Sequence, residues 1–269
     1  MKSKSMKSYK CELTIGWLYP ELMSTYGDRG NIICIQKRCE WRGIDVEILR
    51  LDLGFRIDDL RKCDFLFMGG AQDNQQKIVS EDLKKKRDTL KDLIENELPG
   101  LYICGAYQFL GKYYKEADGT IVNGLGILDL YTENPGESTK RLIGNLVVSA
   151  DLVGLVRPTY EVDVSKTLVG FENHGGRTYL GKTIKPLGQV IKGFGNNGKD
   201  KSEGAIYKNS FGSYLHGPIL PKNPRFADLL ITKALEKKYG DIPTKLPPLD
   251  DSLEIKAHDA IAERLNIKL

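Results

Sequence analysis

The chain has no apolar run long enough to span a membrane and no cysteine pattern that would hold a metal. The charged N-terminus, MKSKSMKSYK, precedes CELTIGWLYP, which is too short and too polar for the core of a signal peptide. The five cysteines are odd in number and include no CxxC pair, which argues against a disulfide framework and a structural zinc site. We therefore expect a reduced, cytoplasmic protein without a bound metal or a membrane-inserted segment.

An excess of one charge is also missing. The 40 Lys and Arg residues are interspersed with 36 Asp and Glu residues, so the formal net charge is only +4. Such a small, scattered basic excess does not indicate nucleic acid or a membrane surface as a partner. The run DLKKKRD (82–88) is interpreted as the solvated face of an amphipathic helix.

Short apolar segments alternate with helical ones in the first half of the chain. Strands are predicted at 13–18, 46–51, 64–70 and 101–104, and a charged helix is predicted at 80–98. Nearly all-apolar strands joined by crossover helices indicate an α/β fold, with a mostly parallel sheet covered by helices on both faces. The loops after its strands should converge on one crevice.

The second half changes character. Gly-rich β segments between 124 and 207 predict β-hairpins inserted before a final strand at 211–217. A helix from Pro224 to Tyr239 and a last helix at 251–265 follow, joined by a Pro-rich bridge.

The length favours one large α/β domain with a tail. We expect the domain at 11–230 and a C-terminal helical extension at 231–269.

Cys104 stands where a strand ends and a helix begins. The order strand, Cys104, Gly105, Ala106, helix is typical of a nucleophile elbow, whose sharp turn presents the side chain above the sheet. A helix N-terminus favours the thiolate, the reactive form of cysteine. Most free cysteines are buried core residues, and that interpretation holds for the other four, which lack such a turn.

Six ordered segments resemble the cobyric-acid-synthase-type (CobB/CobQ-like) class I glutamine amidotransferases. They extend over most of the chain: LYPELMSTYGDRGNI (18–32), FMGGAQDNQQ (67–76), YICGAYQFLG (102–111), RLIGN (141–145), GFENHGGRTYLG (170–181) and YKNSFGSYLHGPIL (207–220). The resemblance implies a flavodoxin-like fold and a glutaminase that releases ammonia from L-glutamine.

The resemblance also implies roles for particular residues. Cys104 would attack the glutamine carboxamide and form a thioester, and His216 would be its base. Arg141 and Gln108 would bind the substrate. The tetrahedral oxyanion needs two preorganised donors, which we expect to be the N–H groups of Gly105 and Gly70.

Three positions depart from the family pattern. Ala71 and Ala106 stand where the family often has glycine, and Pro218 stands where triad-type relatives carry a glutamate two residues after the histidine. We therefore expect a Cys104–His216 dyad, with any third group supplied from elsewhere in the chain or by the partner. Asp28, in YGDRGN, could line the crevice but is interpreted as a helix cap.

Two further patterns are interpreted as structural. His174, with Glu172 two residues before it, is typical of a hairpin histidine rather than a base or metal ligand. GFGNNGKD (193–200) matches GxGxxG, but no helix follows to bind phosphate, so it is interpreted as a turn. His258, in the tail, is expected to be solvated.

Without a nucleotide site in this chain, the activation of an acceptor requires a synthetase partner that binds ATP and Mg. The resemblance implies a Mur-ligase-like subunit that amidates the α-carboxyl of D-glutamate in the peptidoglycan precursor lipid II, forming a heterodimer with this chain. Two alternatives stay open: another acceptor, such as a cobyrinate-type carboxylate, and a catalytically inactive binding subunit.

Overall fold

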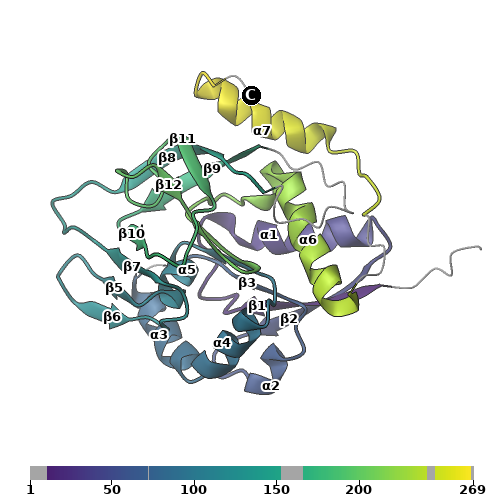
Figure 1. Cartoon of the computed structure of the whole chain (residues 1–269), viewed down its shortest axis with the longest axis horizontal. Helices are drawn as coiled ribbons and strands as arrows, with labels where there is room; N and C mark the ends of the chain where they lie inside the picture. The colour runs from purple at the N-terminus through teal and green to yellow at the C-terminus, as the bar shows by residue number, and fades with distance from the viewer. Residues whose placement is uncertain (1–10, 72, 153–165, 241–245, 268–269) are drawn as a thin grey trace, which may run out of the picture.

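A six-stranded sheet forms the centre of the computed structural model, which describes residues 11–71, 73–152, 166–240 and 246–267 (Figure 1). Its strands follow the order β13-β14-β4-β3-β1-β2. Their bounds are β1 Glu12–Leu18, β2 Asp45–Leu51, β3 Phe65–Met68, β4 Gly100–Ile103, β13 Ala205–Tyr207 and β14 Ser210–Ser213. All neighbours pair in parallel except β13 and β14. Without the edge strand β13, this is the flavodoxin-like strand order.

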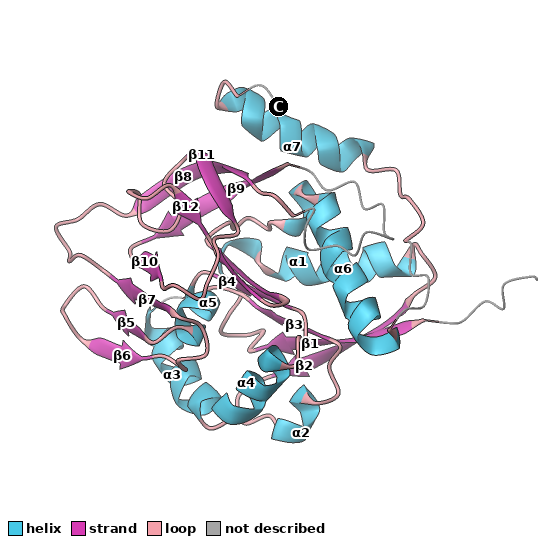
Figure 2. Ribbon diagram, in the orientation of Figure 1, coloured by secondary structure: helices cyan, strands magenta, loops and turns pink. Residues whose placement is uncertain are grey.

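Helices cover both faces of this sheet (Figure 2). One face packs on α1 (Arg29–Glu40) and α6 (Pro224–Tyr239), with β1 contributing Leu13, Ile15 and Trp17 to that core. The other packs on α2 (Ile57–Leu60), α3 (Asp73–Lys84) and α4 (Arg87–Glu95). Because both faces are buried at its centre, β3 and β4 are apolar throughout, whereas the edge strand β2 carries Asp45, Glu47 and Arg50. The predicted fold class is confirmed.

The charged helix expected at 80–98 is two helices. α3 begins at Asp73 and ends at Lys84, and α4 begins only at Arg87. At the break, the Lys86 ammonium bonds the Asp82 carboxylate at 2.6 Å and lies over the Phe55 ring, so this lysine is buried. The interpretation of 82–88 as a wholly solvated face is therefore wrong at Lys86.

The predicted hairpin region forms two smaller sheets. One has the order β10-β7-β5-β6 and the other β12-β11-β8-β9. Their strands are β5 Tyr113–Lys115, β6 Ile121–Asn123, β7 Leu130–Glu133, β8 Leu142–Ser149, β9 Thr167–His174, β10 Arg177–Leu180, β11 Gly188–Lys192 and β12 Ser202–Glu203. A β-bridge between Phe171 and His216 joins β9 to the segment after β14. The insertion therefore reaches the carboxyl edge of the main sheet.

The last helix, α7 (Ser252–Arg264), packs on β9 and on the short helix η3 (Leu220–Lys222). His258 is buried there, with Nε2 3.0 Å from the Thr167 hydroxyl and Nδ1 2.9 Å from the Lys222 carbonyl. The expectation that His258 is solvated is wrong.

The expected boundary between 230 and 231 falls inside α6, which is continuous and largely buried. The division of the chain at that point stays a prediction. Across the described residues, no helix combines the length and apolar character needed to cross a membrane.

Candidate active site

Cys104 occupies the turn between β4 and α5 (Gly105–Leu110), as the sequence predicts. Its backbone has φ 52° and ψ −111°, a conformation that L-residues rarely adopt. Two main-chain bonds hold the turn: Cys104 N–H donates to the Ser213 carbonyl at 2.8 Å, and Gln108 N–H donates to the Cys104 carbonyl at 3.1 Å. The thiol side of the turn faces a pocket.

The other cysteines lie elsewhere. Burial raises the pKa of Cys34, Cys39 and Cys63 to about 12, so their thiols stay protonated and unreactive at neutral pH. None of the four lines the pocket, which contains Cys104 alone among the cysteines.

His216 follows β14 and lines the same pocket as Cys104. A Cβ built on Gly70 would lie 2.8 Å from Cε1 of His216 and 3.2 Å from Cβ of Cys104, so the two side chains flank one point. The imidazole is completely buried, and its Nε2 has no hydrogen-bond partner among the described residues. Burial acts to lower the pKa of His216, but Asp28 and Cys104 outweigh it and raise the pKa to about 10.

Asp28 is the third member of this cluster. Its Oδ1 lies 3.2 Å from Nδ1 of His216, and both side chains are fully buried. The carboxylate makes no capping bond to α1, so the interpretation of Asp28 as a helix cap is wrong. The sequence left open whether a third group beside the Cys104–His216 dyad comes from elsewhere in the chain or from the partner, and the structure places Asp28, from the segment after β1, against His216. The catalytic role of the dyad stays a prediction.

Gly70 does not have the free N–H group that was expected of it as an oxyanion donor. Its N–H donates to Oδ2 of Asp28 at 2.7 Å, so it is not available as an oxyanion donor. The N–H of Ala71 lies on the adjoining stretch, 3.6 Å from the point where a Gly105 Cβ would be. Ala71 lines the same pocket as Cys104, and Gly105 follows Cys104 in the chain, which makes the N–H groups of these two residues candidates for the oxyanion donors. Gly70 supplies space instead, since a side chain there would strike His216.

The pocket has a volume of about 270 Å³. Its lining includes both substrate-binding residues predicted from the sequence, Arg141 and Gln108. Gln108 is buried, and its Nε2 donates to the Tyr214 hydroxyl at 2.8 Å. Arg141 is exposed at the rim and donates twice to Asn173, which the sequence did not single out.

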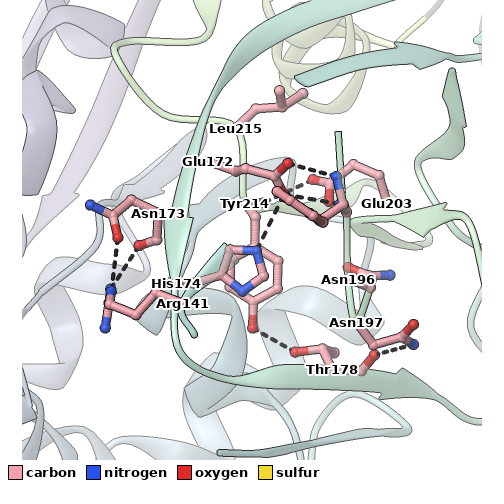
Figure 3. Close-up of polar contacts among 12 residues, drawn as sticks. Arg141, Glu172, Asn173, His174, Thr178, Asn196, Asn197, Glu203, Tyr214 and Leu215 are labelled. Carbon is pink, nitrogen blue, oxygen red and sulfur yellow. Dashed lines mark hydrogen bonds and ion pairs between the residues drawn. The ribbon is translucent and has the colours of Figure 1, made fainter. Parts of the chain in front are cut away.

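His174 lines the pocket, and Figure 3 shows its ring over that of Tyr214. Its ring stacks on Tyr214 with centroids 3.6 Å apart, and its Nδ1 lies 2.8 Å from the Gly176 carbonyl. Its Nε2 lies 3.4 Å from Glu172, whose carboxylate accepts from the N–H groups of Phe194 and Gly195. These contacts fit the structural interpretation of His174.

The Gly-rich segment 193–200 is a series of turns leading to β12, as predicted. Asn196 donates to the Gly204 carbonyl, and Asn197 donates to Asp200 and to the Thr178 carbonyl. The described residues include no group of three or more His, Cys, Asp or Glu side chains arranged to hold a metal.

Comparisons with known proteins agree with this geometry. Residues 14–224 match the CobB/CobQ-like glutamine amidotransferase domain. The chain is 44% identical to the GatD subunit of the glutamine-hydrolysing lipid II isoglutaminyl synthase of Staphylococcus aureus, over 95% of this chain and 97% of that protein. It is 42% identical to the GatD subunit of Streptococcus pneumoniae, over 91% and 89%.

A solved glutamine amidotransferase is similar in fold, with a TM-score of 0.54 and 15% identity over 82% of this chain and 98% of that chain. The chain belongs to the CobB/CobQ-like glutamine amidotransferase family and, within it, to the group of the GatD subunits.

Proposed function

We propose that the chain is the glutamine-hydrolysing subunit of a lipid II isoglutaminyl synthase. The observation that carries the proposal is the cluster of the partly exposed Cys104 with the buried His216 and Asp28, beside a pocket that has Arg141 at its rim. A nucleophile, a base and an orienting acid in this order are the groups that acyl transfer requires.

The reaction proceeds in two halves. A thiolate at Cys104 attacks the carboxamide carbon, and the tetrahedral oxyanion accepts hydrogen bonds from Gly105 and Ala71 N–H. The imidazolium of His216 gives its proton to the nitrogen, the C–N bond breaks, and ammonia leaves a γ-glutamyl thioester. Water, deprotonated by neutral His216, then attacks the thioester and releases glutamate, and the proton stays on His216.

Asp28 serves both halves by fixing the imidazole. With Nδ1 bonded to a carboxylate, Nε2 is left to exchange protons with the reacting groups, and the positive charge of the ring is stabilised. The raised pKa of His216, to about 10, fits a site in which the imidazole carries a proton before glutamine binds. A protonated imidazole in turn stabilises the thiolate.

The fate of ammonia is assigned from the relatives. The GatD proteins are named as subunits of lipid II isoglutaminyl synthase, so a second subunit would receive the ammonia. We assign that role to a MurT-like Mur-ligase subunit, which would bind ATP and Mg, activate the α-carboxyl of D-glutamate in lipid II and form a heterodimer with this chain. The reaction belongs in the cytoplasm, where the ATP for this activation is found.

The test is glutamate formation from glutamine by the chain with its synthetase subunit. Cys104→Ala should reduce the rate to background, while Cys11→Ala, at another partly exposed cysteine, should retain it. Equal rates for Cys104→Ala and the unsubstituted protein would refute the proposal. Supplying lipid II or a cobyrinate as acceptor, with ATP and Mg, then identifies the amidated product.

A further inference from the structure

Asn173 accepts hydrogen bonds from the guanidinium of Arg141 with two different oxygens. Arg141 Nε donates to the side-chain Oδ1 and Nη2 donates to the main-chain carbonyl, both at 2.9 Å (Figure 3). Because one oxygen belongs to the backbone of β9, the guanidinium plane is fixed relative to the sheet. Bonds from a charged donor of this kind are stronger than neutral ones.

These two bonds use the Nε/Nη2 edge of Arg141 and leave its Nη1/Nη2 edge without a bond to the described residues. Among the described residues, partners are present for two of the five guanidinium N–H groups, and three remain. Arg141 lines the pocket, and no carboxylate in the described part of the chain forms an ion pair with it. A free Nη1/Nη2 edge matches a carboxylate in bidentate geometry, so the rim is prepared for a ligand that carries one.

The same asparagine reaches the catalytic end of the pocket. Its Nδ2 donates to the Tyr26 hydroxyl at 2.7 Å. The Tyr26 ring meets the His216 ring edge to face, with centroids 5.0 Å apart. Tyr26 has φ 56° and a 44% exposed side chain, so this strained, exposed position is held by its contacts rather than by backbone preference.

The strand that carries Asn173 is firmly anchored. Its neighbours Glu172 and His174 are 0% and 2% exposed and are bonded to Phe194, Gly195 and Gly176. Successive strand residues point to opposite faces, so anchoring both neighbours on one face directs Asn173 to the other. The orientation of Arg141 is therefore set by a rigid element.

We propose that Asn173 is a positioning residue that orients Arg141 to bind the α-carboxylate of free glutamine and holds Tyr26 across the pocket beside His216. The inference rests on the proposed glutaminase function. An asparagine suits the task better than an aspartate, because its neutral oxygen orients the guanidinium without neutralising it. The full positive charge of Arg141 is then available to the substrate.

The test compares two electrophiles that both alkylate cysteine. A diazo-ketone analogue of glutamine carries the α-carboxylate, whereas iodoacetamide does not. In the full chain, Asn173→Ala and Asn173→Asp should slow alkylation of Cys104 by the diazo-ketone at least about 10-fold, the loss expected for charge-assisted bonds. Their rates with iodoacetamide should stay within about twofold of the unsubstituted protein. In the glutaminase assay, KM should rise more than kcat falls.

Two more variants sharpen the comparison. Tyr26→Phe removes the hydroxyl that Asn173 bonds but leaves both contacts to Arg141, so it should slow the diazo-ketone less than Asn173→Ala. Asn145→Asp places the same charge change on the adjacent strand β8 and should leave both rates unchanged.

The outcomes separate the two proposals. If Asn173→Asp reacts with the diazo-ketone as fast as the unsubstituted protein, or if both reagents slow equally, the positioning role is refuted while the glutaminase assignment stands. If the diazo-ketone fails to label Cys104 in the unsubstituted protein, the proposed function itself fails.

Discussion

The Asp28 carboxylate lies 3.2 Å from Nδ1 of His216, and neither side chain is exposed to solvent. The two residues are separated by 188 positions in the sequence. The Gly70 N–H donates to the other carboxylate oxygen, so both oxygens of Asp28 are bonded. A buried carboxylate satisfied in this way keeps its place and orients the imidazole.

Replacing Asp28 by Asn should reduce kcat of glutamine hydrolysis by about 100-fold or more. The amide retains the shape but cannot stabilise the imidazolium, and it favours the wrong ring tautomer. Steady-state glutaminase assays measure the effect. Asp118→Asn, at an exposed turn, is the matched control and should be neutral. A kcat for Asp28→Asn within a few-fold of the unsubstituted protein would show that His216 needs no acid.

The pH dependence of stability should report the Asp28–His216 pair. The pKa of His216 is raised from 6.5 to about 10 in the folded protein. A raised folded-state pKa stabilises the protein fully below pH 6.5, and the stabilisation is lost as pH rises toward 10. Asp28→Asn should therefore destabilise the chain by about 3–5 kcal/mol at pH 6, and by less at pH 10. Urea unfolding at several pH values checks this, and a pH-independent difference would contradict it.

Glu203 should make the protein less stable at high pH. Burial raises the pKa of Glu203 from 4.5 to about 7, and its Oε2 has no hydrogen-bond partner among the described residues. The raised pKa means that stability is lost as pH rises from 4.5 through 7. Glu203→Gln, which stays neutral, should therefore gain roughly 1–3 kcal/mol relative to the unsubstituted protein between pH 4.5 and pH 8. Thermal melts of both proteins at pH 4.5 and pH 8 measure this gain. The same difference in Tm between the two proteins at both pH values would contradict the prediction.

Arg38 should be essential for stability. Its buried guanidinium pairs with Asp228 on α6 at 2.7 Å and with Asp251, next to α7, at 2.6 Å. Arg38→Ala leaves the Asp251 carboxylate without its partner and Asp228 paired only with Arg42. It should cost about 3–5 kcal/mol in urea unfolding. Asp251→Asn should cost less and expose the tail to limited proteolysis, whereas Asp250→Asn, at the adjacent exposed residue, should not. Equal digestion of Asp251→Asn, Asp250→Asn and the unsubstituted protein would show that the Arg38–Asp251 pair does not hold α7.

A methyl group at Gly70 should inactivate the enzyme. A Cβ there would lie 2.8 Å from the His216 ring, closer than unstrained contacts allow. Gly70→Ala should lower kcat by at least about 100-fold, the cost of misplacing a catalytic group. Gly144→Ala, on β8, meets no atom within 4 Å and should retain activity. Comparable kcat values for the two variants would contradict the packing described here.

The sequence predicted the features that depend on local order. Cys104 was found because a nucleophile elbow is a contiguous pattern. The sheet was found because its central strands β3 and β4, buried on both faces, are apolar throughout. α6 begins and ends at the predicted residues because Pro224 begins the helix and Gly240 follows its end.

Features that depend on distant partners were missed. Asp28 was interpreted as a cap because an aspartate before a helix normally is one, and its true partner lies far along the chain. Gly70 was assigned a free N–H because the bond to Asp28 was not foreseen. Asn173 was not singled out, since an asparagine on a strand has no pattern that reveals a guanidinium across the sheet.

The left-handed backbone at Cys104 implies a conflict between catalysis and robustness. A residue held at φ 52° and ψ −111° costs roughly 1–3 kcal/mol, a strain that glycine would largely avoid. The dead variant Cys104→Gly should therefore melt at a higher temperature than the equally dead Cys104→Ala. A reactive sulfur at this turn is retained for its chemistry, at the expense of heat resistance.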